Sequence, residues 1–223
     1  MCFALFSSMP KNIVLSSIES ERLIKLFGIK VPDAMLVKDS VDALLFAEKI
    51  GYPLVLKVIS KDIVHKTDAK VVAIDVRDSR ELFMNYDLII KHAKKITSDI
   101  DGVLVQRFVY GDVSLIVGGK RDPSFGPVVL VGAGGIFTEL IDDSSIRACP
   151  VSNADAVSMV DGLKISKVFD GFRNINLDKR SVLKVISGVS HLMMTHKEIQ
   201  EIDINPLIIN HDGAFAVDVR VIV

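Results

Sequence analysis

A lysine lies inside an apolar, β-branched segment of the sequence, and a histidine follows it in a charged loop. Lys57 belongs to the run 52–58, and His65 lies between Asp62 and Lys66. Burial of an ammonium group is unfavourable unless an anion accompanies it, so Lys57 indicates a negative charge nearby. Imidazole has an ordinary pKa of about 6.5, which suits proton or phosphoryl transfer at neutral pH. Together the two residues suggest phosphate chemistry.

Two polar residues are expected to face each other in a carboxy-terminal β-hairpin. The turn residues 210–213 join two apolar strands, and either a two-residue or a four-residue loop pairs Asn205 with Asp218 and Asp203 with Arg220. Directly opposed residues share one face, with Cβ atoms about 4.5–5.5 Å apart. An amide oxygen and a carboxylate at this separation could hold Mg²⁺, although the hairpin alone favours a merely solvated outer face. The opposite face is expected to be core, with Ile204, Ile208, Phe215, Val217 and Val219.

Two further segments could contact phosphate. The glycine-rich loop 132–135 follows an apolar strand and could bring backbone N–H groups close to an anion, but its spacing matches neither the dinucleotide-binding nor the Walker motif. A plain tight connection is its default interpretation. Lys120 and Arg121 could clamp phosphate or could be ordinary charges at a strand end, and the sequence leaves both alternatives open.

Composition and cysteine content limit the class of protein. Of the 223 residues, 49% are hydrophobic and 25% are charged, and the net charge is -1, so no overall field favours nucleic acid or an anionic membrane. Cys2 and Cys149 match no metal or redox spacing, which favours free thiols in the cytoplasm. The apolar segment 1–9 lacks a basic region and a cleavage site, so it does not resemble a signal peptide. No apolar run reaches spanning length.

Hydrophobic periodicity predicts alternating helices and strands. Helices are expected at 18–27, 40–50, 82–96, 154–163 and 182–194, and strands at 52–59, 72–76, 103–108, 113–117 and 128–131. Val41, Leu44, Leu45 and Glu48 are expected to share one face of the second helix. The pattern indicates an α+β protein of two lobes that meet near Gln106. The expected domains are an extension at 1–19, a small lobe at 20–105 and a large lobe at 106–223.

Taken in order, these segments resemble the ATP-grasp β subunit of ADP-forming acyl-CoA synthetases, relatives of succinyl-CoA synthetase. The resemblance covers about 20–223 and rests on six motifs: Leu26-Phe27-Gly28-Ile29-Lys30-Val31-Pro32, Pro53-Leu54-Val55-Leu56-Lys57, His65-Lys66-Thr67-Asp68, Lys120-Arg121-Asp122-Pro123-Ser124-Phe125-Gly126-Pro127-Val128, Gly134-Gly135-Ile136-Phe137-Thr138-Glu139 and Asp203-Ile204-Asn205-Pro206-Leu207.

The resemblance implies a two-lobed ATP-grasp fold and a role in making ATP and free acid from acyl-CoA, ADP and phosphate. His65 matches the family histidine that carries the phosphoryl group from a CoA-binding α subunit to the nucleotide, in an assembly expected to be α2β2. Asn205 and Asp218 match the Mg²⁺ ligands, the same pair that the hairpin register brings together. The implied ATP or ADP contacts are Lys57, Gln106, Val109, Lys120, Arg121, Gly134, Gly135 and Glu139.

Four positions depart from the family pattern. Lys70 and Val71 stand where two glycines are usual, which predicts a stiffer phosphate-covering loop, and Arg107 and Ser114 replace acidic residues. The leading hypothesis is therefore an active acetate–CoA ligase β subunit. The alternative is a nonenzymatic or regulatory subunit with weakened nucleotide binding. A carboxylate–amine ligase of the wider ATP-grasp group is disfavoured because such enzymes need no phosphocarrier histidine.

Overall fold

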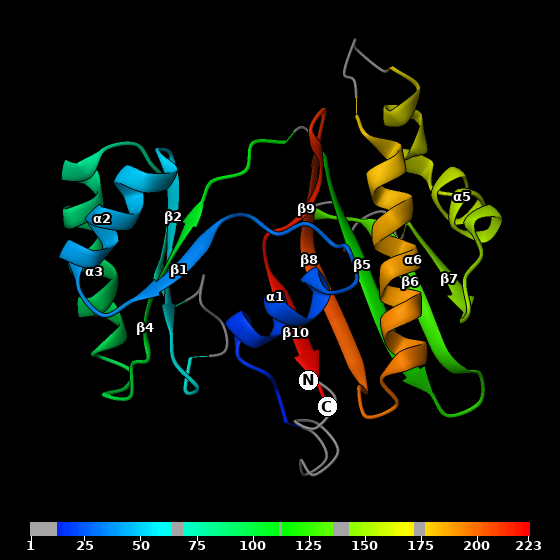
Figure 1. Cartoon of the computed structure of the whole chain (residues 1–223), viewed down its shortest axis with the longest axis horizontal. Helices are drawn as coiled ribbons and strands as arrows, with labels where there is room; N and C mark the ends of the chain where they lie inside the picture. Colours follow the sequence, from blue (N-terminus) through cyan, green and yellow to red (C-terminus); the bar gives the residue numbers. More distant parts are fainter. Residues whose placement is uncertain (1–12, 64–68, 112, 136–142, 172–176) are drawn as a thin grey trace. The chain divides into compact units, whose positions relative to one another are not determined.

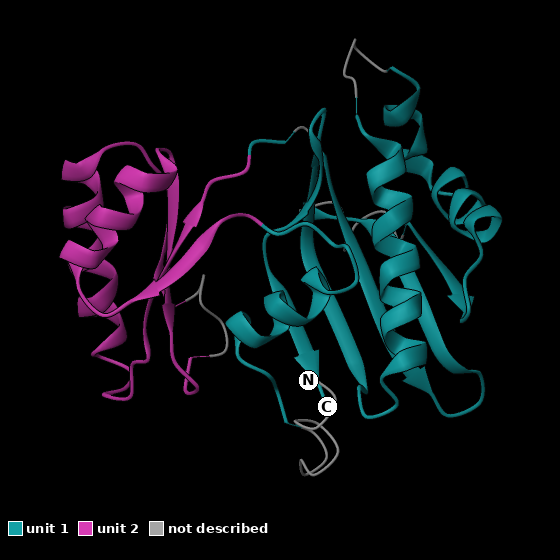
Figure 2. Ribbon diagram, viewed as in Figure 1, with its two compact units in different colours: residues 1–31, 110–223 teal, residues 32–109 magenta. Residues whose placement is uncertain are grey.

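The chain forms two compact units, each with one antiparallel sheet and its own helices (Figure 2). Unit 1 comprises residues 1–31 and 110–223, and unit 2 comprises residues 32–109. The structure is a computed structural model that describes residues 13–63, 69–111, 113–135, 143–171 and 177–223. Within these residues, no helix has both the length and the apolar character needed to cross a bilayer.

Unit 2 is a four-stranded sheet with strand order β1-β4-β2-β3 and two helices packed on one face (Figure 1). Its elements are β1 (Ala34–Val37), α2 (Ser40–Ile50), β2 (Leu54–Ile59), β3 (Val72–Val76), α3 (Ser79–Ala93) and β4 (Gly102–Arg107). The predicted ends of α2 are confirmed. Asp39 caps the helix by accepting hydrogen bonds from the N–H groups of Val41 and Asp42, and Gly51 ends it at φ +79°.

The face that Val41, Leu44, Leu45 and Glu48 share is not the buried face of α2. Val41 and Leu45 are each 60% exposed, whereas Ala43 and Ala47 are fully buried. Both stripes have helical spacing, and the smaller alanines allow the helix to pack closely against its neighbours. Packing between elements, which periodicity alone does not contain, selects the alanine stripe.

A β-bulge in β3 changes the expected alternation of its side chains. Ala73 and Val76 are buried while Ile74 is 65% exposed, so burial along β3 does not follow the strict alternation of a regular strand. The pairing shifts between Leu54, which opposes Val76, and Leu56, which opposes Ala73. The extra residue in β3 reverses the side-chain parity.

Unit 1 is a larger antiparallel sheet with strand order β10-β8-β5-β6-β7, in which β9 also pairs with β8. Figure 1 shows α6 lying along β5 and β6, with α5 next to it. Its elements are α1 (Ser17–Lys25), β5 (Val113–Asp122), β6 (Gly126–Ala133), β7 (Ser144–Ala148), α5 (Asn153–Asp161), the 3₁₀ helix η2 (Lys164–Asp170), α6 (Lys179–Thr195), β8 (Glu201–Asn210), β9 (Gly213–Ala216) and β10 (Val219–Ile222).

Helix α6 supplies much of the core of unit 1. Within the helix predicted at 182–194, Val182, Ile186, Val189 and Met193 are fully buried, which confirms the helical periodicity. The helix approaches β5 closely at Gly119, where an added Cβ would lie 2.8 Å from Cγ of Met193. Strand β7, helix η2 and a separate β10 were not predicted.

The amino-terminal segment differs from the expected domain division. Residues 20–31 were expected in the small lobe, but they belong to unit 1. Ser16 caps α1 in a reciprocal capping box with Glu19, and the N–H of Leu15 donates to the carbonyl of Val221 in β10. Helix α1 packs against β10 and α6, and this packing assigns it to the sheet that contains the carboxy-terminal hairpin.

Candidate active site

The carboxy-terminal strands bring Asn205 next to Asp218. The predicted register is confirmed, because Ile209 opposes Ala214 and Asp203 opposes Arg220. Between these pairs, the N–H of Asn205 donates to the carbonyl of Asp218 at 3.1 Å. Asn205 is exposed and Asp218 is partly exposed. The two oxygen-bearing side chains are therefore neighbours at a surface that a metal ion and its water ligands could reach.

The predicted core face of this hairpin is only partly correct. Ile204 and Val219 are buried as expected. Strand β8 then contains one extra residue relative to β5, because Leu115 opposes Leu207 while Val117 opposes Ile204. This bulge reverses side-chain parity beyond Asn205. Consequently Ile208, Phe215 and Val217 are only partly buried, and the core positions are taken by Leu207, Ile209, Ala214 and Ala216.

Carboxylates concentrate on the polar face of this sheet. The pKa of Asp203 is raised, chiefly by burial and then by the negative charges of Glu201 and Asp218, while Arg220 opposes the shift. Repulsion among carboxylates is relieved by a cation. In the described ranges no group of three or more His, Cys, Asp or Glu side chains could hold a metal. Asn205 and Asp218 would thus supply two oxygens and leave the other positions to water and phosphate, as Mg²⁺ prefers.

Asp203 was predicted to lie opposite Arg220 but was not predicted to belong to this site. The predicted register could have indicated its place, because residues 203 and 205 occupy alternate positions of β8 and so share its polar face. The burial that raises the pKa of Asp203 depends on the folded sheet.

In unit 2, Lys57 and Gln106 are buried on the face of the sheet that lies away from its helices. Lys57 is 9% exposed and Gln106 is 1% exposed. Val55 opposes Gln106 and Lys57 opposes Leu104, so Lys57 and Gln106 are diagonal neighbours, a relation that typically spans about 7–8 Å. Leu56, which precedes Lys57, and Val105, which precedes Gln106, belong instead to the helix-side core. The buried ammonium expected from the sequence is therefore present.

The segment after Gln106 carries another predicted contact and one of the family departures. Val109 is partly buried beyond the end of β4. Arg107 is 46% exposed at its side chain and pairs with Asp33, with Nη2 and Oδ2 3.5 Å apart. Such exposed pairs contribute little to stability. The positive charge introduced at position 107 is partly offset within unit 2.

The structure separates the two neighbouring cations Lys120 and Arg121. Lys120 is exposed on the polar face of β5, opposite Glu201. Arg121 instead donates from Nε to the carbonyl of Ile199 and from Nη2 to the carbonyls of Met193 and His196, each at 2.7 Å. These bonds hold the carboxyl end of α6 against β5. We therefore remove Arg121 from the predicted phosphate contacts and retain Lys120.

The glycine loop after β6 packs tightly on β5. The N–H of Gly134 donates to the carbonyl of Ser114 at 2.9 Å, and an added Cβ at Gly134 would lie 2.9 Å from that carbonyl. Gly135 has φ +73°, a conformation that favours glycine. Ser114, one of the family departures, thus lies directly beneath both glycines. Glu139 and His65 lie outside the described residues.

Val71, one of the two residues expected to stiffen a phosphate-covering loop, is a core residue of unit 2. Its side chain is fully buried in the core of unit 2, and its carbonyl accepts a hydrogen bond from the N–H of Val58. Lys70 has φ +53°, a left-handed conformation that a glycine would adopt without strain. Of these two positions, only position 70 therefore has a left-handed backbone conformation, the conformation that would favour a family glycine.

A model of the ATP-grasp domain family matches residues 9–223. The chain belongs to this family. Its sequence is 36% identical over 217 residues to the acetate–CoA ligase [ADP-forming] I subunit beta of Pyrococcus furiosus, a match that covers 95% of this chain and 93% of the relative. This ATP-grasp chain is thus a homologue of β subunits of ADP-forming acyl-CoA ligases.

Another relative is longer than this ATP-grasp chain. The 4-hydroxybutyrate–CoA ligase [ADP-forming] of Nitrosopumilus maritimus is 35% identical over 198 residues, which cover 87% of this chain but only 28% of the relative. In that protein, sequence corresponding to this chain occupies about a quarter of a single polypeptide.

A solved structure gives the same fold. The dinucleotide-forming acetyl-CoA synthetase 1 of Ca. Korarchaeum cryptofilum, in complex with coenzyme A and Ca-AMPCP, matches with a TM-score of 0.90 and 37% identity, covering 94% of this chain and 93% of the other. In another structure of that protein, at 36% identity, a TM-score of 0.83 and coverage of 96% and 93%, Mg-AMPPCP is bound and a phosphohistidine segment points towards the nucleotide site. The two units described above are therefore an ATP-grasp fold.

Proposed function

We propose that this chain is the β subunit of an ADP-forming acyl-CoA ligase, with acetate as the expected acid, and that it relays a phosphoryl group through His65 to ADP. The observation that carries the proposal is the adjacency of Asn205 and Asp218 on a carboxylate-rich sheet face. Membership of the family and the nucleotide analogues bound to the Korarchaeum relative support it independently.

The polar face of unit 1 would bind the metal and the phosphates. Asn205 and Asp218 would hold Mg²⁺, which when bound would neutralise phosphate charge and orient the phosphoryl group. Lys120 is exposed on the same face and would attract a phosphate oxygen. The glycines at 134 and 135 leave the backbone uncovered by side chains, so phosphate could approach it closely.

The buried residues of unit 2 would contact other parts of the nucleotide. Lys57, which is 9% exposed, would donate its ammonium to phosphate. Gln106 and Val109 would contact the base and ribose, the first through its amide and the second through its methyl groups. We also retain Glu139 as a proposed nucleotide contact.

His65 would act as nucleophile and then as leaving group. A neutral ring nitrogen attacks the phosphorus of an acyl phosphate or of a phosphohistidine of the companion subunit, a nitrogen–phosphorus bond forms, and carboxylate or imidazole departs. The terminal oxygen of ADP then attacks the same phosphorus. The nitrogen–phosphorus bond breaks, which yields ATP and restores histidine.

A companion subunit would supply the CoA-binding part of this reaction. The P. furiosus relative is named a β subunit, and the N. maritimus relative contains a much longer chain. We propose an α2β2 assembly in the cytoplasm. Cys149, a free thiol whose pKa is raised by burial, fits a reducing compartment.

The alternative is a nonenzymatic or regulatory subunit with weakened nucleotide binding, and it rests on the changes at Lys70, Val71, Arg107 and Ser114. Burial of Val71 in the core of unit 2 favours the enzymatic proposal, because this side chain is not part of a phosphate-covering surface.

Phosphoryl labelling tests the proposal on the chain by itself. Incubation with Mg²⁺ and ATP labelled in the γ-phosphate should give an acid-labile, base-stable label that His65→Ala lacks and that His92→Ala retains. His92 is a suitable control because its Nδ1 lies 2.9 Å from the carbonyl oxygen of Lys70, in a described, structural position. A label that persists in His65→Ala would refute the relay. With the companion present, ATP should form from acetyl-CoA, ADP and phosphate.

A further inference from the structure

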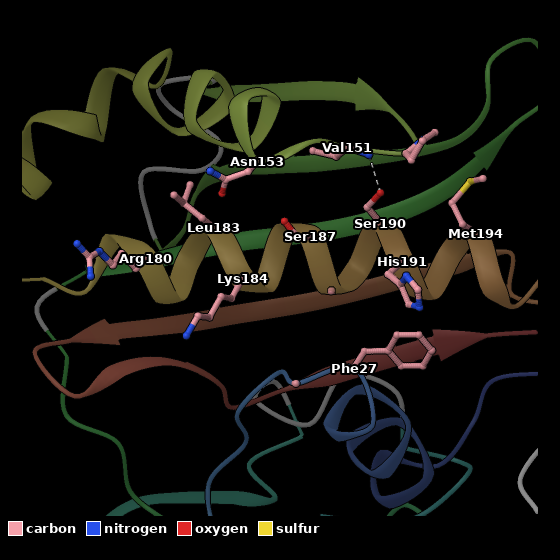
Figure 3. Close-up of a pocket in the computed structure, with 13 residues that line it drawn as sticks. Phe27, Val151, Asn153, Arg180, Leu183, Lys184, Ser187, Ser190, His191 and Met194 are labelled. Carbon is pink, nitrogen blue, oxygen red and sulfur yellow. Dashed lines mark hydrogen bonds between the residues drawn. The ribbon is translucent and has the colours of Figure 1, made fainter.

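An open groove of about 920 Å³ runs along the outer side of α6 (Figure 3). Its floor is α6, and its walls are Phe27 and Gly28 after α1 and the segment 150–153 that leads into α5. All of these residues belong to unit 1.

The groove lies on the opposite side of α6 from the sheet. Val189 and Met193 of α6 face β5, where they approach Gly119. Lys184 and His191 instead line the groove. Because the proposed metal residues occupy the polar face of that sheet, the helix layer separates the groove from the candidate active site.

Apolar side chains form much of the groove surface. Met194 is 44% exposed, and Leu183 and Phe27 are only partly buried. The rings of Phe27 and His191 pack together with their centroids 5.3 Å apart. Exposed apolar surface of this kind on an outer helix face is typical of an interaction site.

Positive charge lies at one end of the groove. Arg180 and Lys184 are exposed on successive turns of α6, and neither forms a salt bridge within the described part of the chain. No aspartate or glutamate is among the described residues that line the groove. The nearby Asp178 accepts hydrogen bonds from the hydroxyl and the backbone N–H of Ser181, and its pKa is lowered mainly by Ser181 and least by the charge of Lys184. The groove therefore favours an occupant that carries negative charge beside apolar side chains.

The length of the groove favours a polypeptide segment. Arg180 and Met194 are fourteen positions apart on α6, which corresponds to about 21 Å along the helix. An amphipathic segment of three or four helical turns, with carboxylates at one end, would match both the length and the charge.

We propose that this groove docks the companion subunit through an acidic, amphipathic segment. The inference rests on the proposed function, because that function requires a second polypeptide. The N. maritimus ligase carries its additional sequence in the same chain, whereas the P. furiosus relative of matched length is named a subunit. The exposed positive charges of Arg180 and Lys184 match the negative charge of the proposed segment and so assign the contact to this surface.

Charge reversal in the groove tests the proposal. The binding partner is a purified protein from the same genome as this chain. It is the homologue of the part of the N. maritimus ligase that this chain does not match. Arg180→Glu combined with Lys184→Glu should weaken its affinity for this chain at least about tenfold and reduce the salt dependence of association. The matched control is Arg22→Glu with Lys197→Glu, which reverses two exposed unit 1 cations outside the groove and should leave affinity unchanged.

A second pair of variants tests the apolar part of the groove. Met194→Asp should also weaken companion binding, whereas Met84→Asp, at a position 61% exposed on α3 of unit 2, should not. Isothermal titration measures the affinities, and thermal unfolding checks that each variant remains folded. Unchanged affinity in folded groove variants would overturn the proposal, as would an effect confined to Met84→Asp.

Two further outcomes would also overturn the docking proposal. One is absence of binding between the wild-type chain and the companion. The other is self-association of the isolated chain that the groove variants abolish, because the occupant would then be a second copy. Affinity for Mg·ADP and labelling of His65 are measured on the isolated chain. They distinguish failure of this inference from failure of the proposed function, and the groove variants should leave both unchanged.

Discussion

Replacement of Arg121 by methionine should destabilise the protein without weakening nucleotide binding. Methionine keeps an unbranched apolar stem but removes the guanidinium that donates to the carbonyls of Met193, His196 and Ile199. With about 1 kcal/mol net for each of these three bonds, the free energy of unfolding should fall by about 3 kcal/mol. The corresponding decrease in Tm is roughly 6–12 °C for a chain of this size.

Denaturant unfolding and titration with Mg·ADP measure the two quantities separately. Lys120→Met is the matched control, because it removes the neighbouring cation from the polar face of the same strand. It should leave the unfolding free energy within about 0.5 kcal/mol of wild type, as is usual for a surface substitution, and should weaken Mg·ADP binding. The reasoning would be refuted if Arg121→Met kept wild-type stability and lost nucleotide affinity, since Arg121 would then be a phosphate clamp.

The other predictions concern the altered loop and the metal site. Lys70→Gly should stabilise the protein by about 0.5–1 kcal/mol, because glycine adopts the left-handed backbone at this position without strain. Val71→Ala should destabilise the protein by about 2 kcal/mol, because it leaves a cavity in the core. Denaturant unfolding measures both changes, and unchanged stability in Val71→Ala would contradict the core assignment. Asp218→Ala should weaken Mg²⁺-dependent ADP binding far more than metal-free binding, and Asn205→Ala should do so less; equal losses with and without Mg²⁺ would indicate structural roles. The raised pKa of Asp203 favours protons in the folded state, so stability should decrease as pH rises from the ordinary aspartate pKa through the raised one; Asp203→Asn should remove that decrease in unfolding measured against pH, and should be more stable than wild type at neutral pH.

Elements with local signals could be predicted from the sequence pattern. Helix α2 spans Ser40–Ile50 as predicted, because the carboxylate cap at Asp39 and the left-handed freedom of Gly51 depend on adjacent residues. The hairpin register that joins Asn205 to Asp218 also followed from the sequence, since the turn and the period of two determine strand pairing. The family motifs could also be recognised from the sequence, because each is a short run of consecutive residues.

Which side chains those elements bury depends on packing between distant segments. The bulge in β8 between Ile204 and Leu207 and the left-handed Asp75 reverse side-chain parity, so Leu207 replaces Ile208 in the core and Ile74 is exposed. Arg121 became a structural residue because carbonyls more than seventy positions away lie within reach of its guanidinium. Val71 became core for a related reason: its burial depends on how β2 and β3 pack beneath the helices of unit 2, a relation between distant segments that no local pattern contains.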